Sequence, residues 1–273
     1  TFRRVEMEKK HPNDIRTVVR KKYGEVAKSD ATGCCIPVSS CCGEPAIPLE
    51  NLGTLTGYSQ DELRLAPEGS HLDLGCGNPQ AIAALKPGET VLDLGSGGGF
   101  DCFLAAKQVG DTGRVIGVDM TPEMVSKARE NALKGDYSNV EFRLGEIEHI
   151  PAADGSIDVI ISNCVINLSP NKLEVFKEAF RILKPGGRLA ISDVVATAQL
   201  PPEFKDDLDL LSACVSGAAT VMELTEMLQE AGFQDIEIQT KDESRELISH
   251  WVPGKNVQDY IVSATIEAVK PEH

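Results

Sequence analysis

Cysteine is the residue type in this 273-residue sequence that points most directly to chemistry, because the chain contains eight of them. They are Cys34, Cys35, Cys41, Cys42, Cys76, Cys102, Cys164 and Cys214. In a reducing compartment, an excess of cysteine more often indicates metal binding or redox chemistry than structural disulfides. Any single cysteine can equally be a buried, inert side chain. Composition alone therefore leaves two interpretations open for each position.

A second feature is typical of cofactor binding by a glycine-rich turn. The segments His71–Gly77 (HLDLGCG) and Val91–Gly97 (VLDLGSG) both combine an apolar lead, an aspartate and Gly-x-Gly. Only the second is followed by more glycines and a regular helix pattern, with Asp119 at the end of the next strand. Glycines let the backbone approach a ligand closely, and an acid on the second strand accepts hydrogen bonds from ribose hydroxyls. We therefore expect the cofactor at the second segment, and the missing Gly-Lys-Ser/Thr ending disfavours ATP.

The elements that must position these residues follow from strand and helix patterns that alternate after residue 90. The expected strands are 90–94, 114–118, 140–144, 157–162, 188–195, 235–240 and 262–269. The expected helices are 11–30, 58–65, 101–109, 122–133, 172–183 and an interrupted helical stretch over 199–232. Thr121 is placed to cap the helix that begins at residue 122, and Lys184–Gly187 is expected to form a turn. The alternation predicts an α/β fold with a doubly wound, mostly parallel, seven-stranded sheet.

Three regions are expected along the chain. Residues 1–70 are predicted to hold an N-terminal helix and a cysteine-rich loop, and residues 71–197 a Rossmann-like cofactor-binding core. Residues 198–273 are predicted to form a helical segment that covers the substrate, followed by the final strands of the sheet.

The bulk composition limits the classes of partner. A formal net charge of −15 argues against nucleic acids and anionic membranes, since phosphate-binding surfaces need clustered Lys and Arg. No apolar run is long enough to span a bilayer, and the charged N-terminal stretch lacks the apolar region of a secretory signal. The expected location is the cytoplasm.

A set of motifs between residues 90 and 193 resembles the class I methyltransferases. VLDLGSG, VIGVDM, GEIEHIP, IDVIISN and LKPGG occur in the order of that family. The resemblance implies a class I methyltransferase fold and S-adenosyl-L-methionine as cofactor. It further implies contacts to the cofactor from Asp93, Gly95, Ser96, Gly97, Asp119, Met120, Glu146, Ile147 and Asn163. Asp93, Gly95 and Gly97 would surround its methionine part. Asp119 and Met120 would lie around ribose and adenine, Glu146 and Ile147 would flank adenine, and Asn163 would border the site.

More specific segments are similar to the arsenite methyltransferases. DLGSGGGFDCF, SNCVINLSP, SDVV and SACVSGA match that family, and SNCVINL discriminates best among them. The resemblance implies that Cys76, Cys164 and Cys214 bind trivalent arsenic. The residue types suit this chemistry because arsenic(III) is soft and prefers thiolates. Its lone pair can attack a methyl group without loss of a proton, so no catalytic base is needed.

The resemblance also implies a disulfide relay in which thioredoxin or glutathione restores the thiols. The candidates are Cys34, Cys35, Cys41, Cys42 and Cys102. The family pattern has one N-terminal cysteine where this sequence has two adjacent pairs, so the relay residue among the four stays open.

Two alternatives remain. The first is a small-molecule C- or O-methyltransferase in which the cysteines are incidental. The second is a zinc-binding or metal-sensing protein that uses the N-terminal cysteine pairs, although adjacent cysteines rarely converge on one zinc ion. The number of methyl groups transferred and the oligomeric state are not determined by the sequence.

Overall fold

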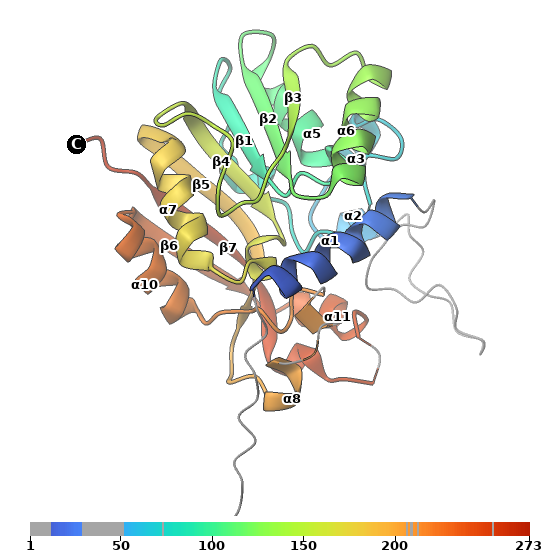
Figure 1. Ribbon diagram of the computed structural model, residues 1–273, viewed down its shortest axis with the longest axis vertical. Helices are drawn as coiled ribbons and strands as arrows, with labels where there is room; N and C mark the ends of the chain where they lie inside the picture. Colours follow the sequence, from blue (N-terminus) through green and yellow to red (C-terminus); the bar gives the residue numbers. More distant parts are fainter. Residues whose placement is uncertain are drawn as a thin grey trace, which may run out of the picture.

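The computed structural model describes residues 12–28, 52–72, 74–205, 207, 210–211, 213–252 and 254–273 (Figure 1). The described residues do not include Cys34, Cys35, Cys41 and Cys42. The prediction that one of these four serves in a relay therefore concerns residues outside the described ranges.

A seven-stranded sheet with strand order β3-β2-β1-β4-β5-β7-β6 forms the centre of the molecule. The strands are β1 (Thr90–Leu94), β2 (Arg114–Asp119), β3 (Val140–Leu144), β4 (Ile157–Asn163), β5 (Leu183–Ala196), β6 (Gln234–Lys241) and β7 (Ile261–Val269). β1 to β5 pair in parallel, whereas β7 is antiparallel to both β5 and β6. The predicted doubly wound, mostly parallel sheet is confirmed.

Helices cover both faces of this sheet, which gives three layers. They are α1 (Pro12–Lys28), α2 (Leu52–Leu55), α3 (Gln60–Leu65), α4 (Gln80–Ala83), α5 (Phe100–Val109), α6 (Pro122–Lys134), α7 (Lys172–Ile182), α8 (Pro202–Lys205), α10 (Val221–Ala231) and α11 (Ser244–Ser249). Figure 1 shows α7 and α10 side by side, away from α5 and α6. None of the helices in the described ranges is long and apolar enough to cross a membrane.

The alternation of side chains along the strands explains why two cores form. In β1, Leu92 and Leu94 pack with Phe176 of α7 and Leu228 of α10 in one apolar cluster. Val91, on the opposite face, packs in a second cluster that includes side chains of α5 and α6. Because successive strand residues point to opposite faces, a strand that is buried on both faces, as this one is, requires helices on both sides of the sheet.

Three local expectations differ from the structure. The Thr121 side chain makes no capping hydrogen bond to the first turn of α6, and the backbone N–H of Thr121 donates to the carboxylate of Asp119. The segment Lys184–Gly187 belongs to β5, which begins at Leu183.

The expected helical stretch over 199–232 is helical mainly in α8 and α10 among the described residues. Between them, Gly217 lies so close to the chain that a Cβ there would be 2.0 Å from the Asn167 carbonyl oxygen. This close approach brings the Cys214 segment down onto the end of β4, where a continuous helix would not fit.

Candidate active site

A cavity lies at the carboxyl ends of β1, β2 and β4, where parallel α/β sheets bind their ligands. Its lining includes the glycine-rich turn after β1, together with Asp119, Met120, Ile147 and Asn163. Cys164 also lines it, so the same cavity extends from the glycine turn to a cysteine. All the predicted cofactor residues except Glu146 line this cavity.

Asp119 organises the cofactor end of the cavity. Its carboxylate accepts from the Gly97 N–H at 3.0 Å and from the Thr121 N–H at 2.8 Å. Burial raises the pKa of Asp119, and these two backbone donors act in the opposite direction. The side chain therefore ties the glycine turn to the end of β2 and presents carboxylate oxygens to the cavity.

The turn itself has the features of a ligand cradle. Gly97 has φ +51°, and a Cβ there would meet nothing within 4 Å, whereas a Cβ at Gly95 would lie 2.3 Å from Val165. The Ser96 hydroxyl is buried and has no hydrogen-bond partner among the described residues. A buried hydroxyl ordinarily has a partner. An unsatisfied one in a lined cavity fits a polar ligand such as the cofactor.

Two further acids lie deep in this cavity. Asp93 accepts a hydrogen bond from the Cys102 thiol at 3.3 Å, and burial is the main cause of its raised pKa. Asp101 accepts from the Tyr58 hydroxyl at 2.8 Å, and burial raises its pKa to about 6. The sequence prediction had included Asp93 but neither Asp101 nor Tyr58, although Asp101 stands inside the quoted DLGSGGGFDCF motif.

Cys102 lies apart from the other described cysteines. It is fully buried in the apolar cluster beneath α5 and α6, whereas Cys76, Cys164 and Cys214 pack in another cluster. Burial and the neighbouring carboxylate of Asp93 raise the pKa of its thiol. Thiol–disulfide exchange needs an accessible thiolate, and this environment provides neither access nor a lowered pKa.

Helix α1 forms one wall of the cavity through Arg16, Val19 and Tyr23. The guanidinium of Arg16 pairs with Glu146 at 3.3 Å and with Glu148 at 3.0 Å. These two acids follow β3, so the ion pairs join the N-terminal helix to the core (Figure 1). Glu146, which was predicted to flank adenine, faces α1 in this arrangement.

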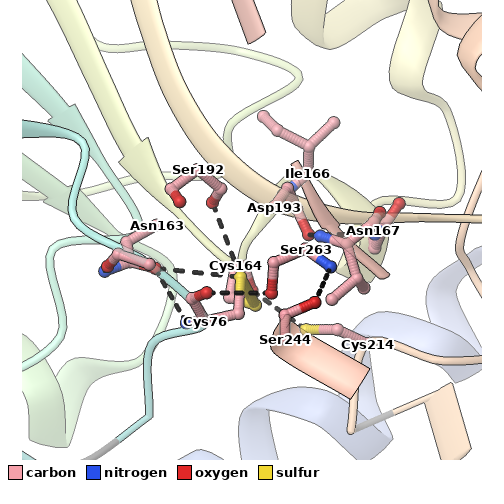
Figure 2. Close-up of a disulfide and its surroundings, with 12 residues drawn as sticks. Cys76, Asn163, Cys164, Ile166, Asn167, Ser192, Asp193, Cys214, Ser244 and Ser263 are labelled. Atoms are coloured by element: carbon pink, nitrogen blue, oxygen red, sulfur yellow. Dashed lines mark hydrogen bonds between the residues drawn. A yellow bond between two sulfur atoms is a disulfide. The ribbon is translucent and has the colours of Figure 1, made fainter. Parts of the chain in front are cut away.

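Three predicted arsenic ligands meet beside the cavity (Figure 2). Cys76 and Cys164 are joined in a disulfide with Cα atoms 5.9 Å apart. The Cys214 thiol donates to the Cys164 carbonyl oxygen at 3.0 Å, and all three side chains are buried. The structure thus brings together residues that are far apart in the sequence, and it shows two of the three thiols in the oxidised state.

The backbone at two of these cysteines is unusual. Cys164 has φ +58° and Cys214 has φ +61°, a left-handed conformation that is unfavourable for residues with a Cβ. Such strain concentrates at functional sites. Both residues lie in the group of three cysteines, since Cys164 is bonded to Cys76 and the Cys214 thiol contacts Cys164.

A carboxylate completes this group. One oxygen of Asp193 and the sulfur atoms of Cys76 and Cys164 all lie within 4.8 Å of one another. Asp193 accepts hydrogen bonds from the backbone N–H groups of Ile166 and Val194, and burial raises its pKa to about 6. This residue stands in the SDVV motif, but no local pattern in the sequence relates it to the thiols.

Comparison with known proteins adds to this geometry. Residues 85–232 match a family model described as a methyltransferase domain. The chain is 54% identical over 95% of its length to the arsenite methyltransferase of Halobacterium salinarum, and 40% identical over 80% to that of Aquipseudomonas alcaligenes. It spans 68% and 61% of those two proteins, respectively.

Among solved structures, the chain resembles an arsenic(III) S-adenosylmethionine methyltransferase from Chlamydomonas reinhardtii. The two are 33% identical, with a TM-score of 0.60 over 82% of this chain and 74% of that one.

The strand order, the glycine turn after β1 and the acid at the end of β2 define a class I methyltransferase that uses S-adenosylmethionine. Within that class, the extent of the similarity identifies the family. The chain belongs to the arsenite methyltransferases.

Proposed function

We propose that this chain transfers methyl groups from S-adenosylmethionine to trivalent arsenic held by the thiolates of Cys76, Cys164 and Cys214. The observation that carries the proposal is the position of Cys164, which lines the cofactor cavity and also belongs to the buried cluster of the three cysteines. Bound arsenic would therefore lie next to the methyl donor.

The residues that line the cavity support the following contacts to the cofactor. Asp119 offers its carboxylate to the ribose hydroxyls, Ser96 and the glycines of the turn surround the methionine part, and Met120 and Ile147 contact the adenine. Asp93 offers its carboxyl group to the methionine amine, and Asn163 borders the site. S-adenosylmethionine brings an electrophilic methyl group on a sulfonium.

The protein contributes mainly position. Three thiolates fix arsenic and leave its lone pair free to attack the methyl carbon, so that no proton has to leave arsenic. Holding two reactants in line accounts for much of the rate of such a reaction. The transfer uses the arsenic lone pair and so converts arsenic formally from the trivalent to the pentavalent state, while the donor leaves as its thioether. Return to the trivalent state needs two electrons, which two thiols of the external reductant supply as they form a disulfide, and one cysteine leaves arsenic as a thiol. The methylated arsenic then keeps at most two thiolates, for which Cys164 and Cys214 suffice.

The thiols must be reduced before arsenic binds. The Cys76–Cys164 disulfide accepts two electrons and two protons to give two thiols, while an external thiol reductant is oxidised to its own disulfide. We propose thioredoxin or glutathione as this reductant. The need for reduced thiols also supports a cytoplasmic location.

The test is a product time course with reduced protein, S-adenosylmethionine and either arsenite or methylarsenite as acceptor. Cys164→Ser and Cys214→Ser are expected to abolish methylation of both acceptors. Cys76→Ser is expected to reduce the first methylation much more than the second, because only the first needs three thiolates. Retained activity in Cys164→Ser or Cys214→Ser, or equal losses for both acceptors in Cys76→Ser, would contradict the proposed ligand set.

A further inference from the structure

The loop that carries Cys76 has no regular secondary structure of its own, yet its backbone is held at three points. The Cys76 N–H donates to Asn163 Oδ1 at 3.1 Å, and the Cys76 carbonyl accepts from the Ser263 hydroxyl at 3.0 Å (Figure 2). The Gly77 carbonyl accepts from Asn163 Nδ2 at 2.7 Å. Two of the three hydrogen bonds come from one side chain, at the end of β4.

The loop also lies directly on that side chain. A Cβ at Gly75 would be 2.5 Å from Asn163 Nδ2, a separation that real side chains do not tolerate. Glycine at this position therefore allows the loop to approach Asn163. Cys164, the disulfide partner of Cys76, directly follows Asn163 in the sequence. Asn163 therefore holds the Cys76 loop next to Cys164.

The orientation of the Asn163 amide is fixed by its other partners. Its Nδ2 also donates to the Tyr58 hydroxyl oxygen at 3.0 Å, and that hydroxyl donates its single proton to Asp101. A tyrosine hydroxyl has one proton to donate. Since Asp101 takes that proton, Asn163 must present its N–H groups to Tyr58 and Gly77, which leaves its oxygen for the Cys76 N–H.

We propose that Tyr58 and Asn163 are positioning residues that hold Cys76 as the third arsenic ligand. The inference rests on the proposed function. The proposed positioning role affects the methylation of only one of the two substrates. Arsenite requires Cys76 as a ligand, whereas methylarsenite is held by Cys164 and Cys214. Loosening the Cys76 loop therefore impairs the first methylation and spares the second.

The ratio of the two rates isolates this effect. Tyr58, Asp101 and Asn163 also line the cofactor cavity, so substitutions at these positions can change cofactor binding. Both methylations use the same cofactor site, and a change there lowers both rates together. At saturating S-adenosylmethionine, only displacement of the Cys76 loop changes the ratio.

The variants are Asn163→Ala, which removes both hydrogen bonds from this side chain to the loop, and Tyr58→Phe, which leaves them but removes the group that orients the amide. Relative to methylarsenite, we expect kcat/KM for arsenite to fall about 30-fold in Asn163→Ala and about fivefold in Tyr58→Phe.

Matched controls remove similar groups away from the site. Asn139 Nδ2 also donates to two backbone carbonyls, at Ala106 and Gly110, and the Tyr137 hydroxyl donates to Leu65. Asn139→Ala and Tyr137→Phe are expected to leave the ratio unchanged even where they lower stability.

A binding measurement supplements the kinetics. Trp251 packs against the apolar cluster that contains the three cysteines, and it is the one tryptophan in the chain. Its fluorescence can follow arsenite binding to the reduced protein without any turnover, and weaker arsenite binding in the two variants with unchanged methylarsenite binding is the expected result.

The outcomes separate the two proposals. If the wild-type protein methylates neither arsenical, the proposed function fails. If the wild-type protein methylates both and the variants lower the two rates by the same factor, the positioning role of Tyr58 and Asn163 is overturned while the function stands. Tyr58→Phe retains the ring and its packing, so a failure of Asn163→Ala to fold does not prevent a decision.

Discussion

The ion pair between Arg16 of α1 and Glu148 gives a quantitative prediction about how the N-terminal helix closes the cofactor cavity. The exposed fraction of the side chain is 16% for Arg16 and 6% for Glu148, so the pair is largely withdrawn from water. Apart from Arg16, Glu148 accepts a hydrogen bond from the Ser169 hydroxyl at 2.7 Å. Among the described residues, replacement of Arg16 by alanine therefore leaves this buried carboxylate with one neutral hydrogen-bond donor, and with Lys172 as a remaining positive charge that acts on it.

The expected penalty follows from that burial. Removing one partner of a buried ion pair costs about 3 kcal/mol or more, because the remaining charge is uncompensated. The protein can avoid this penalty by undocking α1, which exposes Glu148 and opens the wall formed by Arg16, Val19 and Tyr23. The cofactor must then redock the helix, so we expect Arg16→Ala to raise the Kd for S-adenosylmethionine, by roughly 150-fold when a penalty of about 3 kcal/mol acts in full against binding.

A double-mutant cycle measured by calorimetric titration with S-adenosylmethionine tests this reasoning. Glu148→Gln removes the charge, so the double variant Arg16→Ala/Glu148→Gln should bind the cofactor more tightly than Arg16→Ala alone. Lys28→Ala is the matched control on the same helix, since the Lys28–Glu123 pair is exposed and contributes less than about 1 kcal/mol. A double variant that binds as weakly as Arg16→Ala, or more weakly, would refute the explanation by a buried unpaired charge.

Two further predictions concern buried carboxylates. Asp119→Ala leaves the Gly97 and Thr121 N–H groups without their acceptor. We therefore expect the free energy of unfolding to fall by about 3 kcal/mol in urea titrations, and S-adenosylmethionine binding to be lost. Unchanged cofactor affinity would show that Asp119 does not contact the ribose. Asp193→Asn tests a pH dependence: burial raises the pKa of Asp193 from 3.8 to about 6 in the folded state, so the folded protein binds the proton more tightly than the unfolded chain, and this contribution to stability is lost as the pH rises from about 4 to about 6. The stability of the wild type relative to Asp193→Asn should therefore fall across that window by up to roughly 3 kcal/mol, and a difference that rises or stays constant would contradict the assignment.

Features defined by local pattern were predictable from the sequence. The apolar run of β1 followed by glycines, and Asp119 at the end of β2, determined the cofactor turn and its acid because each signal lies within a few residues. The helix ends were less well predicted. Thr121 has the residue type of a cap and stands at the N-cap position of α6, but its side chain accepts no hydrogen bond from the first turn.

Contacts between distant segments could not be derived in this way. Cys76, Cys164 and Cys214 were named through a family resemblance, whereas the link from Tyr58 through Asn163 to Cys76 appears only once β4 and two loops are placed in space. The same holds for Arg16, whose partner Glu148 follows a strand on the far side of the cavity. A sequence pattern depends only on residues that are close in the chain. These interactions join elements that are far apart in the chain and become neighbours only through tertiary packing.

The left-handed backbone at Cys164 and Cys214 has a consequence for how these positions change over time. Glycine adopts such φ values without the steric penalty of a Cβ, so a mutation from cysteine to glycine relieves strain in the folded chain while it removes a thiol. Selection for folding alone would then oppose such mutations less than at ordinary core positions. We therefore expect lineages that no longer meet arsenic to lose these two thiols before they lose the fold.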